Sequence, residues 1–168
     1  QCELNDLFVD QELVCAQARK IIAAGATQVE GISKKDIIFK DFKYTFMRKD
    51  PPVDENYINA LHLLGLAETQ GAKVFNKPNS IKEFNEKVFS IYFKDFIPRT
   101  LITSNLSKIE DFHNELEEPI VVKPLDGMGG KSIYMMEEIN DEEYKILEKL
   151  TNNYKTQIVI QEFLPDIY

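Results

Sequence analysis

The sequence predicts a mixed α/β and α+β fold, in which a parallel layer is followed by an antiparallel-leaning α+β module. In the first half, a strand, a helix and a strand follow one another between Tyr44 and Phe75, an order that favours parallel pairing. In the second half, short apolar strands alternate with two helices, and a glycine-rich loop joins two of the strands. Both halves are therefore expected to build their cores on a sheet.

A hairpin is the first predicted element. Leu7–Val9 and Leu13–Ile22 read as strands around a turn at Asp10–Gln11. Residues 23–43 are mixed and poorly periodic, so they carry no firm prediction.

The parallel layer begins at 44–47, whose unbroken apolar character predicts a buried strand. Pro51 and Pro52 end this strand, because proline cannot continue a ladder. Asp54 is the expected N-cap of a helix that Gly71 ends, and residues 73–75 form the next strand.

Another helix is predicted from Ser80 to the segment closed by Pro98, because Ser80–Glu83 reads as a capping box. Its apolar stripe consists of Ile81, Phe84, Val88, Ile91 and Tyr92. At about 100° per residue, Lys87 falls at the border of this stripe. The spacing alone favours a surface lysine at this position.

The second half is predicted to follow the order strand, helix, strand, loop, strand, helix, strand. The expected strands are 100–103, 120–123, 132–136 and 157–163, and the expected helices are 106–116 and 141–150.

The stretch VVKPLDGMGGKSIYMM (Val121–Met136) looks like a phosphate-binding loop but fails two well-known patterns. A Walker A loop needs a glycine where Leu125 stands, and the Rossmann fingerprint needs one at Ser132. The stretch is therefore a hairpin loop between strands. Its glycines could let backbone N–H groups face phosphate oxygens, although a plain hairpin fits the loop equally well.

Lys123 ends the apolar run Ile-Val-Val and precedes a proline. A charge in this position is costly unless it has a partner, so Lys123 is expected to meet one.

Composition excludes several classes of protein. A net charge of −8 argues against a nucleic-acid partner, and no apolar run is long enough to suggest a membrane span. No signal peptide is recognisable. Cys2 and Cys15 are expected to be reduced thiols of a cytoplasmic protein.

Because the chain starts at Gln1 and stops at Tyr168 just after a strand, it reads as a fragment of a longer protein.

Four stretches taken in order resemble the bacterial type of glutathione synthetase, a member of the ATP-grasp ligase superfamily. They are FMRKDPPVD (46–54), NEKVF (85–89), VVKPLDGMGGKSI (121–133) and QEFLP (161–165). The resemblance implies a partial pre-ATP-grasp, substrate-binding domain at 1–79, a connecting helix at 80–98 and the first ATP-grasp subdomain at 99–168. It also implies that the second half of the ATP-grasp fold is absent.

Site residues follow from the same resemblance. Lys87 and Lys123 would contact phosphate oxygens, and the loop glycines would close over the triphosphate. Arg48 and Asp50 would bind the peptide substrate, although an Arg48–Asp50 surface pair is the alternative. The residues implied to bind ATP are Lys87, Lys123, Gly127, Gly129, Gly130, Gln161, Glu162, Phe163 and Leu164. For the last four, the backbone of Glu162 and Leu164 would contact the adenine edge and Phe163 and Leu164 its ring, although a core strand end fits Phe163 nearly as well.

The implied reaction joins γ-glutamylcysteine to glycine through an acyl phosphate, with ATP and Mg²⁺. The metal ligands are expected beyond Tyr168, so no catalytic or metal-binding residue is assigned here and the chain alone is expected to be inactive. Expected partners are the small-molecule substrates, and family members usually form oligomers, which leaves a homo-oligomer open. Another ATP-grasp carboxylate–amine ligase and a truncated, non-catalytic nucleotide-binding module remain alternatives.

Overall fold

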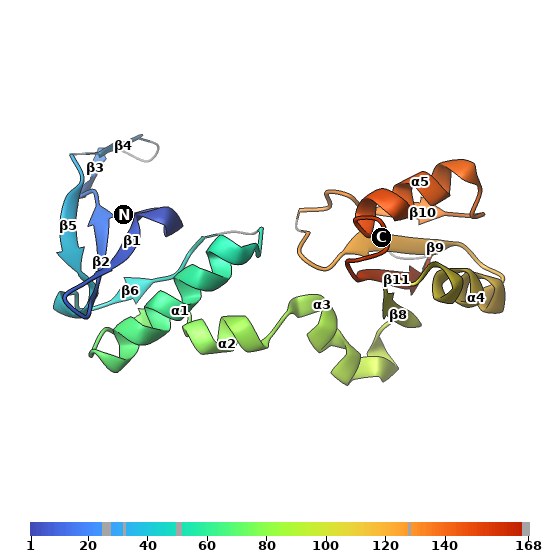
Figure 1. Ribbon diagram of the computed structural model, residues 1–168, viewed down its shortest axis with the longest axis horizontal. Coiled ribbons are helices and arrows are strands. Elements are labelled where there is room, and N and C mark those ends of the chain that lie inside the picture. The colour runs from blue at the N-terminus through green and yellow to red at the C-terminus, as the bar shows by residue number, and fades with distance from the viewer. Residues whose placement is uncertain (25–27, 32, 50–51, 128, 166–168) are drawn as a thin grey trace. The chain divides into compact units, whose positions relative to one another are not determined.

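The computed structural model describes residues 1–24, 28–31, 33–49, 52–127 and 129–165. The chain forms two compact units, Gln1–Phe84 (unit 1) and Asn85–Tyr168 (unit 2), which we describe separately. Figure 1 labels the elements of both. In the described part of the chain, no helix combines the length and apolar character that crossing a membrane requires.

Unit 1 opens with two antiparallel sheets. The first has the order β1-β2-β5 and the second pairs β3 with β4. The bounds are η1 Leu4–Asp6, β1 Leu7–Asp10, β2 Leu13–Ala18, β3 Ile21–Ala24, β4 Gln28–Gly31, β5 Lys35–Ile38 and η2 Phe39–Asp41. The predicted hairpin is confirmed by the pairing of Leu7 with Ala16, but its second strand ends at Ala18 rather than at Ile22.

The predicted parallel layer is confirmed. Strands β6 (Thr45–Phe46) and β7 (Val74–Phe75) pair in parallel and flank α1 (Glu55–Thr69). Helix α1 starts where its cap predicted, because the Asp54 carboxylate accepts a hydrogen bond of 2.8 Å from the Tyr57 N–H. After its last turn the chain leaves the helix through Gly71, whose φ of +101° suits glycine.

The predicted burial of residues 44–47 is wrong for most of the stretch. Met47 is buried, whereas Tyr44 and Phe46 remain 48% and 66% exposed. In the described chain β6 pairs with β7 alone, so one edge of this short strand has no neighbouring strand. Unbroken apolar character therefore did not imply burial.

The segment from 80 to 98 is helical, but the prediction of one continuous helix is wrong. Helix α2 (Pro78–Glu83) begins before Ser80, with Lys77 as its N-cap, so the predicted capping box does not start it. Proline suits the first helical position because it has no N–H to leave unpaired.

A break at Phe84 (φ −110°, ψ 81°) separates α2 from α3 (Glu86–Phe89). The Asn85 side chain caps α3 by accepting from the N–H groups of Lys87 and Val88. A 3₁₀ segment, η3 (Ser90–Phe96), follows with non-helical angles at one residue. Because asparagine at an N-cap stabilises a new helix start, α3 begins as a separate helix here.

Unit 2 contains a four-stranded antiparallel sheet in the order β10-β9-β11-β8. Its elements are β8 Thr100–Thr103, α4 Leu106–Leu116, β9 Ile120–Pro124, β10 Tyr134–Met136, α5 Asp141–Leu150 and β11 Ile158–Glu162. These match the predicted order and nature of the elements. The third strand starts later than predicted, because Ser132 adopts a φ of +59° outside the strand region.

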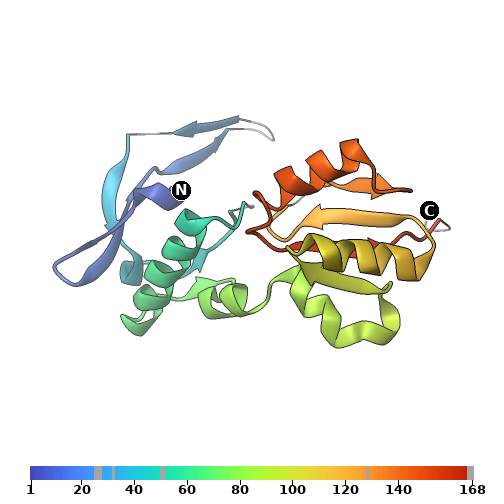
Figure 2. The ribbon, with the colours of Figure 1, turned by 45° about the vertical axis from the view of Figure 1, so that its right-hand side comes forward.

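The two faces of this sheet differ in chemistry. One face packs against α4 and α5, which Figure 2 shows on the same side of the sheet. The side chains that form this core include Ile109, Phe112, Ile120, Val122, Leu147, Ile158 and Ile160. Because side chains alternate along a strand, Lys123 and Gln161 lie on the opposite face. That face carries the candidate site.

Candidate nucleotide site

Lys123 is placed by the central strand β9. Its neighbours Val122 and Ile120 are fully buried on the core side, which turns the lysine toward the other face. The Lys123 ammonium donates a hydrogen bond of 2.6 Å to the Gln161 side-chain oxygen on β11. Burial lowers the pKa of Lys123 below its ordinary value, and the nearby Lys87 charge lowers it further. Lys123 therefore meets a neutral partner, not the counter-charge that would fully compensate a buried ammonium.

Lys87 lies in the first turn of α3. Its Nζ donates to the Gly127 carbonyl at 2.7 Å and to the Leu125 carbonyl at 3.5 Å, and it pairs with the Glu86 carboxylate at 2.8 Å. The Lys87 side chain is 14% exposed, whereas that of Glu86 is 73% exposed. The surface position that spacing alone favoured is therefore wrong, because the Lys87 ammonium contacts the backbone of the glycine loop.

The glycine loop, residues 126–131, depends on its glycines for different reasons. Gly129 and Gly130 adopt φ values of +68° and +73°, in the left-handed region that side chains with a Cβ rarely enter. At Gly127 a Cβ would lie 2.6 Å from the Pro124 Cγ, so there the limit is space. The intervening Met128 lies outside the described residues.

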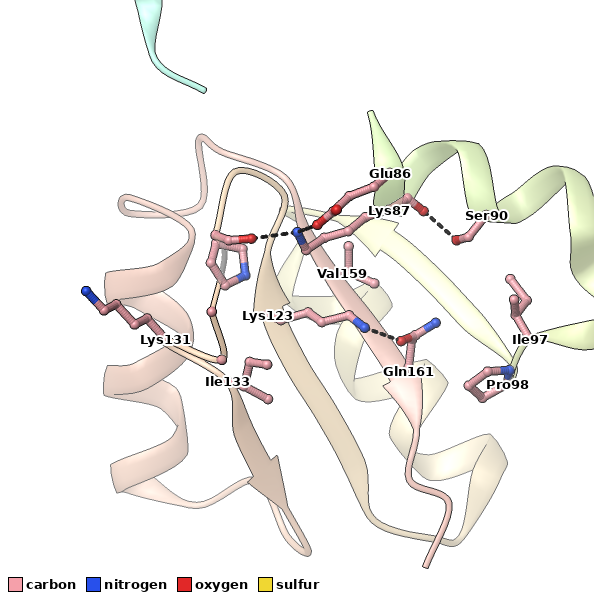
Figure 3. Close-up of a pocket in the computed structure, with 14 residues that line it drawn as sticks. Glu86, Lys87, Ser90, Ile97, Pro98, Lys123, Lys131, Ile133, Val159 and Gln161 are labelled. Carbon is pink, nitrogen blue, oxygen red and sulfur yellow. Dashed lines mark hydrogen bonds and ion pairs between the residues drawn. The ribbon is translucent and has the colours of Figure 1, made fainter. Parts of the chain in front are cut away.

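Unit 2 has a cavity of about 440 Å³ at this face. Its lining residues are Glu86, Lys87, Ser90, Ile97, Pro98, Lys123, Pro124, Gly127, Gly129, Gly130, Lys131, Ile133, Val159 and Gln161. Figure 3 shows Lys87 and Lys123 extending into this space, with Gln161 facing Lys123 and Lys131 directed away from both. Six residues predicted to bind ATP are thus brought together here: Lys87, Lys123, Gly127, Gly129, Gly130 and Gln161.

The other three predicted ATP-binding residues, Glu162, Phe163 and Leu164, are not among those that line the cavity. The backbone N–H groups of Glu162 and Phe163 donate to the carbonyls of Arg99 and Pro119 at 3.0 Å each. These two donors extend the sheet at the end of β11. The predicted adenine contacts of this stretch stay a prediction.

The predicted peptide-binding residues belong to unit 1. Arg48 follows β6, is exposed, and lines a separate cavity of about 540 Å³ with mostly apolar walls. Its neighbour Lys49 pairs with Glu3 at 2.8 Å. Asp50 lies outside the described residues, so neither the Arg48–Asp50 pair nor a joint substrate site is described.

Sequence reasoning missed the side-chain partners of the lysines. The family resemblance placed Gln161 in the adenine-binding linker. The structure shows that the Gln161 side chain is hydrogen-bonded to Lys123 and to Thr100. Strand alternation was the available signal, because Gln161 and Val159 lie on one face of β11, as Lys123 and Val121 do on β9. It also missed Ile133 and Val159, which give part of the cavity an apolar wall.

This arrangement suits an anionic ligand. Two ammonium groups share one cavity, and the Lys87 charge lowers the pKa of Lys123, after the larger effect of burial. A bound polyanion would remove that repulsion and would accept charge-assisted hydrogen bonds from both lysines. Among the described residues, no group of three or more His, Cys, Asp or Glu side chains is arranged to hold a metal ion.

Comparison with known proteins identifies the class of unit 2 and then its family. Residues 86–168 match the family described as prokaryotic glutathione synthetase, ATP-grasp domain. Residues 1–82 match prokaryotic glutathione synthetase, N-terminal domain. Unit 2 therefore belongs to the ATP-grasp class. Because the two matches name one family and together span nearly the whole sequence, the chain belongs to the prokaryotic glutathione synthetase family.

Individual relatives agree with this assignment. The chain is 38% identical to the glutathione synthetase of Vibrio vulnificus (strain CMCP6) over 167 residues, covering 98% of this chain and 52% of the relative. It is 37% identical to that of Buchnera aphidicola subsp. Schizaphis graminum (strain Sg), with the same coverage of both chains. The chain spans about half the length of the curated relatives it matches.

A solved structure of the ATP-grasp ligase PsnB, complexed with precursor peptide PsnA2 and AMPPNP, shares 17% identity with this chain. The match has a TM-score of 0.48 and covers 88% of this chain and 52% of that one.

Proposed function

We propose that this chain forms the leading portion of an ATP-dependent glutathione synthetase, which joins γ-glutamylcysteine to glycine in the cytoplasm. Within it, residues 99–168 would serve the nucleotide, 1–79 the peptide substrate, and 80–98 would connect them. The observation that carries the proposal is the cavity in which Lys87, Lys123 and the glycine loop come together. Membership of the family supports ATP as the ligand of this cavity.

The residues of the cavity fit the phosphate end of ATP. Lys87 and Lys123 would neutralise phosphate oxygens, and N–H groups of the glycine loop would approach them without interference from side chains. Lys87 would exchange its present carbonyl acceptors, Gly127 and Leu125, for phosphate oxygens. Such an exchange would couple nucleotide binding to the position of the loop.

ATP supplies the driving force for amide formation, because a phosphorylated carboxylate has a good leaving group. The residues of this chain would bind, orient and screen the phosphates, which is the larger part of catalysis in phosphoryl transfer. Arg48 would bind a substrate carboxylate as a guanidinium, and Asp50 would contribute to the same substrate site. Mg²⁺ is part of the proposal, but the described residues do not form a set of ligands that fits it.

The test is the release of phosphate from ATP by the complete gene product. We expect release to require both γ-glutamylcysteine and glycine, and glutathione to form in equal amount. The 168-residue chain alone should give no such release. Release with a different amine or acid in place of these substrates would instead indicate another ATP-grasp ligase.

A binding measurement tests the nucleotide site separately from turnover. A non-hydrolysable ATP analogue should bind the complete gene product and lose affinity when Lys123 is replaced by alanine. If the analogue binds equally well to both proteins, the assignment of the cavity to ATP is wrong.

A further inference from the structure

Three side chains form a hydrogen-bonded row across the cavity face of the unit 2 sheet. The Lys123 ammonium on β9 donates to the Gln161 Oε1 on β11 at 2.6 Å. The Gln161 Nε2 donates to the Thr100 hydroxyl on β8 at 2.7 Å. Figure 3 shows the first of these contacts inside the cavity.

Strand register explains why these three residues meet. Gln161 pairs directly with Thr100 on one side, and the neighbouring pair on its other side is Val159 with Lys123. Directly opposed residues share a face, and diagonal neighbours lie within reach of long side chains. The row therefore follows from the order of the three adjacent strands β9, β11 and β8.

The direction of every hydrogen bond in the row is determined. Thr100 Oγ1 lies 2.7 Å from the Pro98 carbonyl, which can only accept, so the single hydroxyl proton points there. The hydroxyl must then accept from Gln161, which turns the amide nitrogen toward Thr100 and the amide oxygen toward Lys123. A backbone carbonyl thus orients the amide that receives the lysine.

The chemical nature of this acceptor matters for the charge of the site. The amide oxygen holds the ammonium in place but contributes no negative charge. A carboxylate at position 161 would orient Lys123 equally well but would neutralise it and compete with an anionic ligand. The amide therefore leaves the full lysine charge available to the cavity.

We propose that Gln161, oriented by Thr100, is a positioning residue that holds Lys123 toward the phosphates of the nucleotide without neutralising its charge. The inference rests on the proposed function, since it assumes that Lys123 meets phosphate oxygens. It assigns the Gln161 side chain a role apart from the adenine-binding linker.

The test uses five variants of the complete gene product and a non-hydrolysable ATP analogue, with affinity measured by calorimetry across a pH series. Gln161→Glu should weaken binding at neutral pH by about tenfold or more, because the charge-assisted contact to phosphate is lost to the carboxylate. It should also move the alkaline loss of binding to higher pH, since a carboxylate favours the charged lysine. Gln157→Glu introduces the same charge at an exposed position and should do neither.

Thr100→Val removes the hydroxyl with little change in shape and should weaken binding by a few-fold, about the value of one neutral hydrogen bond. Thr100→Ser keeps the hydroxyl and should recover most of that loss. If Gln161→Glu lowers the melting temperature strongly, the valine and serine pair decides the question alone.

The possible outcomes separate the two proposals. If Gln161→Glu matches Gln157→Glu in affinity and in pH profile, or if Thr100→Ser binds as poorly as Thr100→Val, Gln161 is not a positioning residue. If Lys123→Ala itself binds the analogue normally, the nucleotide site is wrong and the proposed function fails with it.

Discussion

Unit 1 and unit 2 each present a basic residue at or near an apolar strand. Arg48 lies two residues after β6, and Lys123 lies within β9. Strand β6 has two residues and one partner strand in the described chain, and Arg48 is exposed. Strand β9 has five residues and pairs on both sides, and Lys123 is half-buried and hydrogen-bonded to Gln161. Side chains of neighbouring strands can orient a charged group only where those strands flank it and place their side chains on the same face of the sheet.

The hydrophobic cores of the two units are also built differently. In unit 1 the buried side chains gather around α1, with Leu61 fully buried among them. In unit 2 they lie between the sheet and the helices α4 and α5, with Ile160 fully buried. Unit 2 thereby packs one sheet face into its core, while the other face borders the cavity.

The largest expected effect tests whether the two cores are self-contained. Leu61→Ala should destabilise unit 1 by about 2–5 kcal/mol, and Ile160→Ala should destabilise unit 2 by a similar amount, because each leaves a cavity in a packed core. Hydrogen exchange should show faster amide exchange in 1–84 for the first variant and in 85–165 for the second. Equal acceleration in both units by either variant would contradict separate cores.

The next effect tests the contrast between the two basic side chains. In the complete gene product, Lys123→Ala should lower kcat/KM for ATP by about ten- to a hundredfold, the value of a charge-assisted contact of about 1.5–3 kcal/mol. Lys87→Ala should act in the same direction, whereas Arg48→Ala should raise the KM for the dipeptide and leave that for ATP unchanged.

Lys145→Ala, at an exposed position on α5, serves as the control for the loss of a lysine charge. Steady-state kinetics with each substrate varied in turn distinguishes these cases. A Lys123→Ala enzyme with the ATP kinetics of Lys145→Ala would remove the functional contrast between the units.

Two glycines allow a smaller effect to be compared. Gly71 in unit 1 and Gly130 in unit 2 both have positive φ values, +101° and +73°, and open space around the position of a Cβ. Valine at either position should cost about 1–2 kcal/mol of stability, because the left-handed region is unfavourable for residues with a Cβ. Only Gly130→Val should also reduce turnover, measured at a temperature where both variants are folded. If Gly71→Val reduces turnover as much, the glycine loop has no special role.

The smallest effect is the response of each unit to pH. The Lys34 hydrogen bond lowers the pKa of Asp6 in unit 1 below 3.8, so the stability it contributes is lost as the pH falls through the folded value. In unit 2, burial and then Lys87 lower the pKa of Lys123 below 10.5. Between the folded and the unfolded pKa of Lys123, the unfolded chain binds more protons than the folded chain. The free energy of unfolding should therefore rise with pH across this interval.

Denaturant unfolding across a pH series, followed by a probe in each unit, checks both signs. Asp6→Asn should flatten the acid side of the unit 1 curve, and Lys123→Met should flatten the alkaline side of the unit 2 curve. An alkaline rise that persists in Lys123→Met would mean that another group produces it.

The sequence by itself determined the elements that depend on local signals. Helices 106–116 and 141–150 appear with the predicted ends, because asparagine caps and regular apolar spacing are local properties of the chain. The parallel unit between Thr45 and Phe75 followed from a cap, a glycine and the order of elements. Lys123 and the loop glycines stood out because a charge at the end of an apolar run and clustered glycines are visible without a structure. Lys87 was singled out only by the resemblance to the family, which also assigned all of these residues to ATP.

Tertiary structure alone decided the features that depend on distant residues. The helix predicted from Ser80 breaks at Phe84, where Asn85 both caps α3 and donates to the Leu125 carbonyl at 3.4 Å. Strands β4 and β5 lie in a stretch without periodicity, and each is defined by its partner strand. Lys123 and Thr100 can both hydrogen-bond to the Gln161 side chain only once three strands have taken their order and register. Order and register are properties of the sheet and not of any one segment.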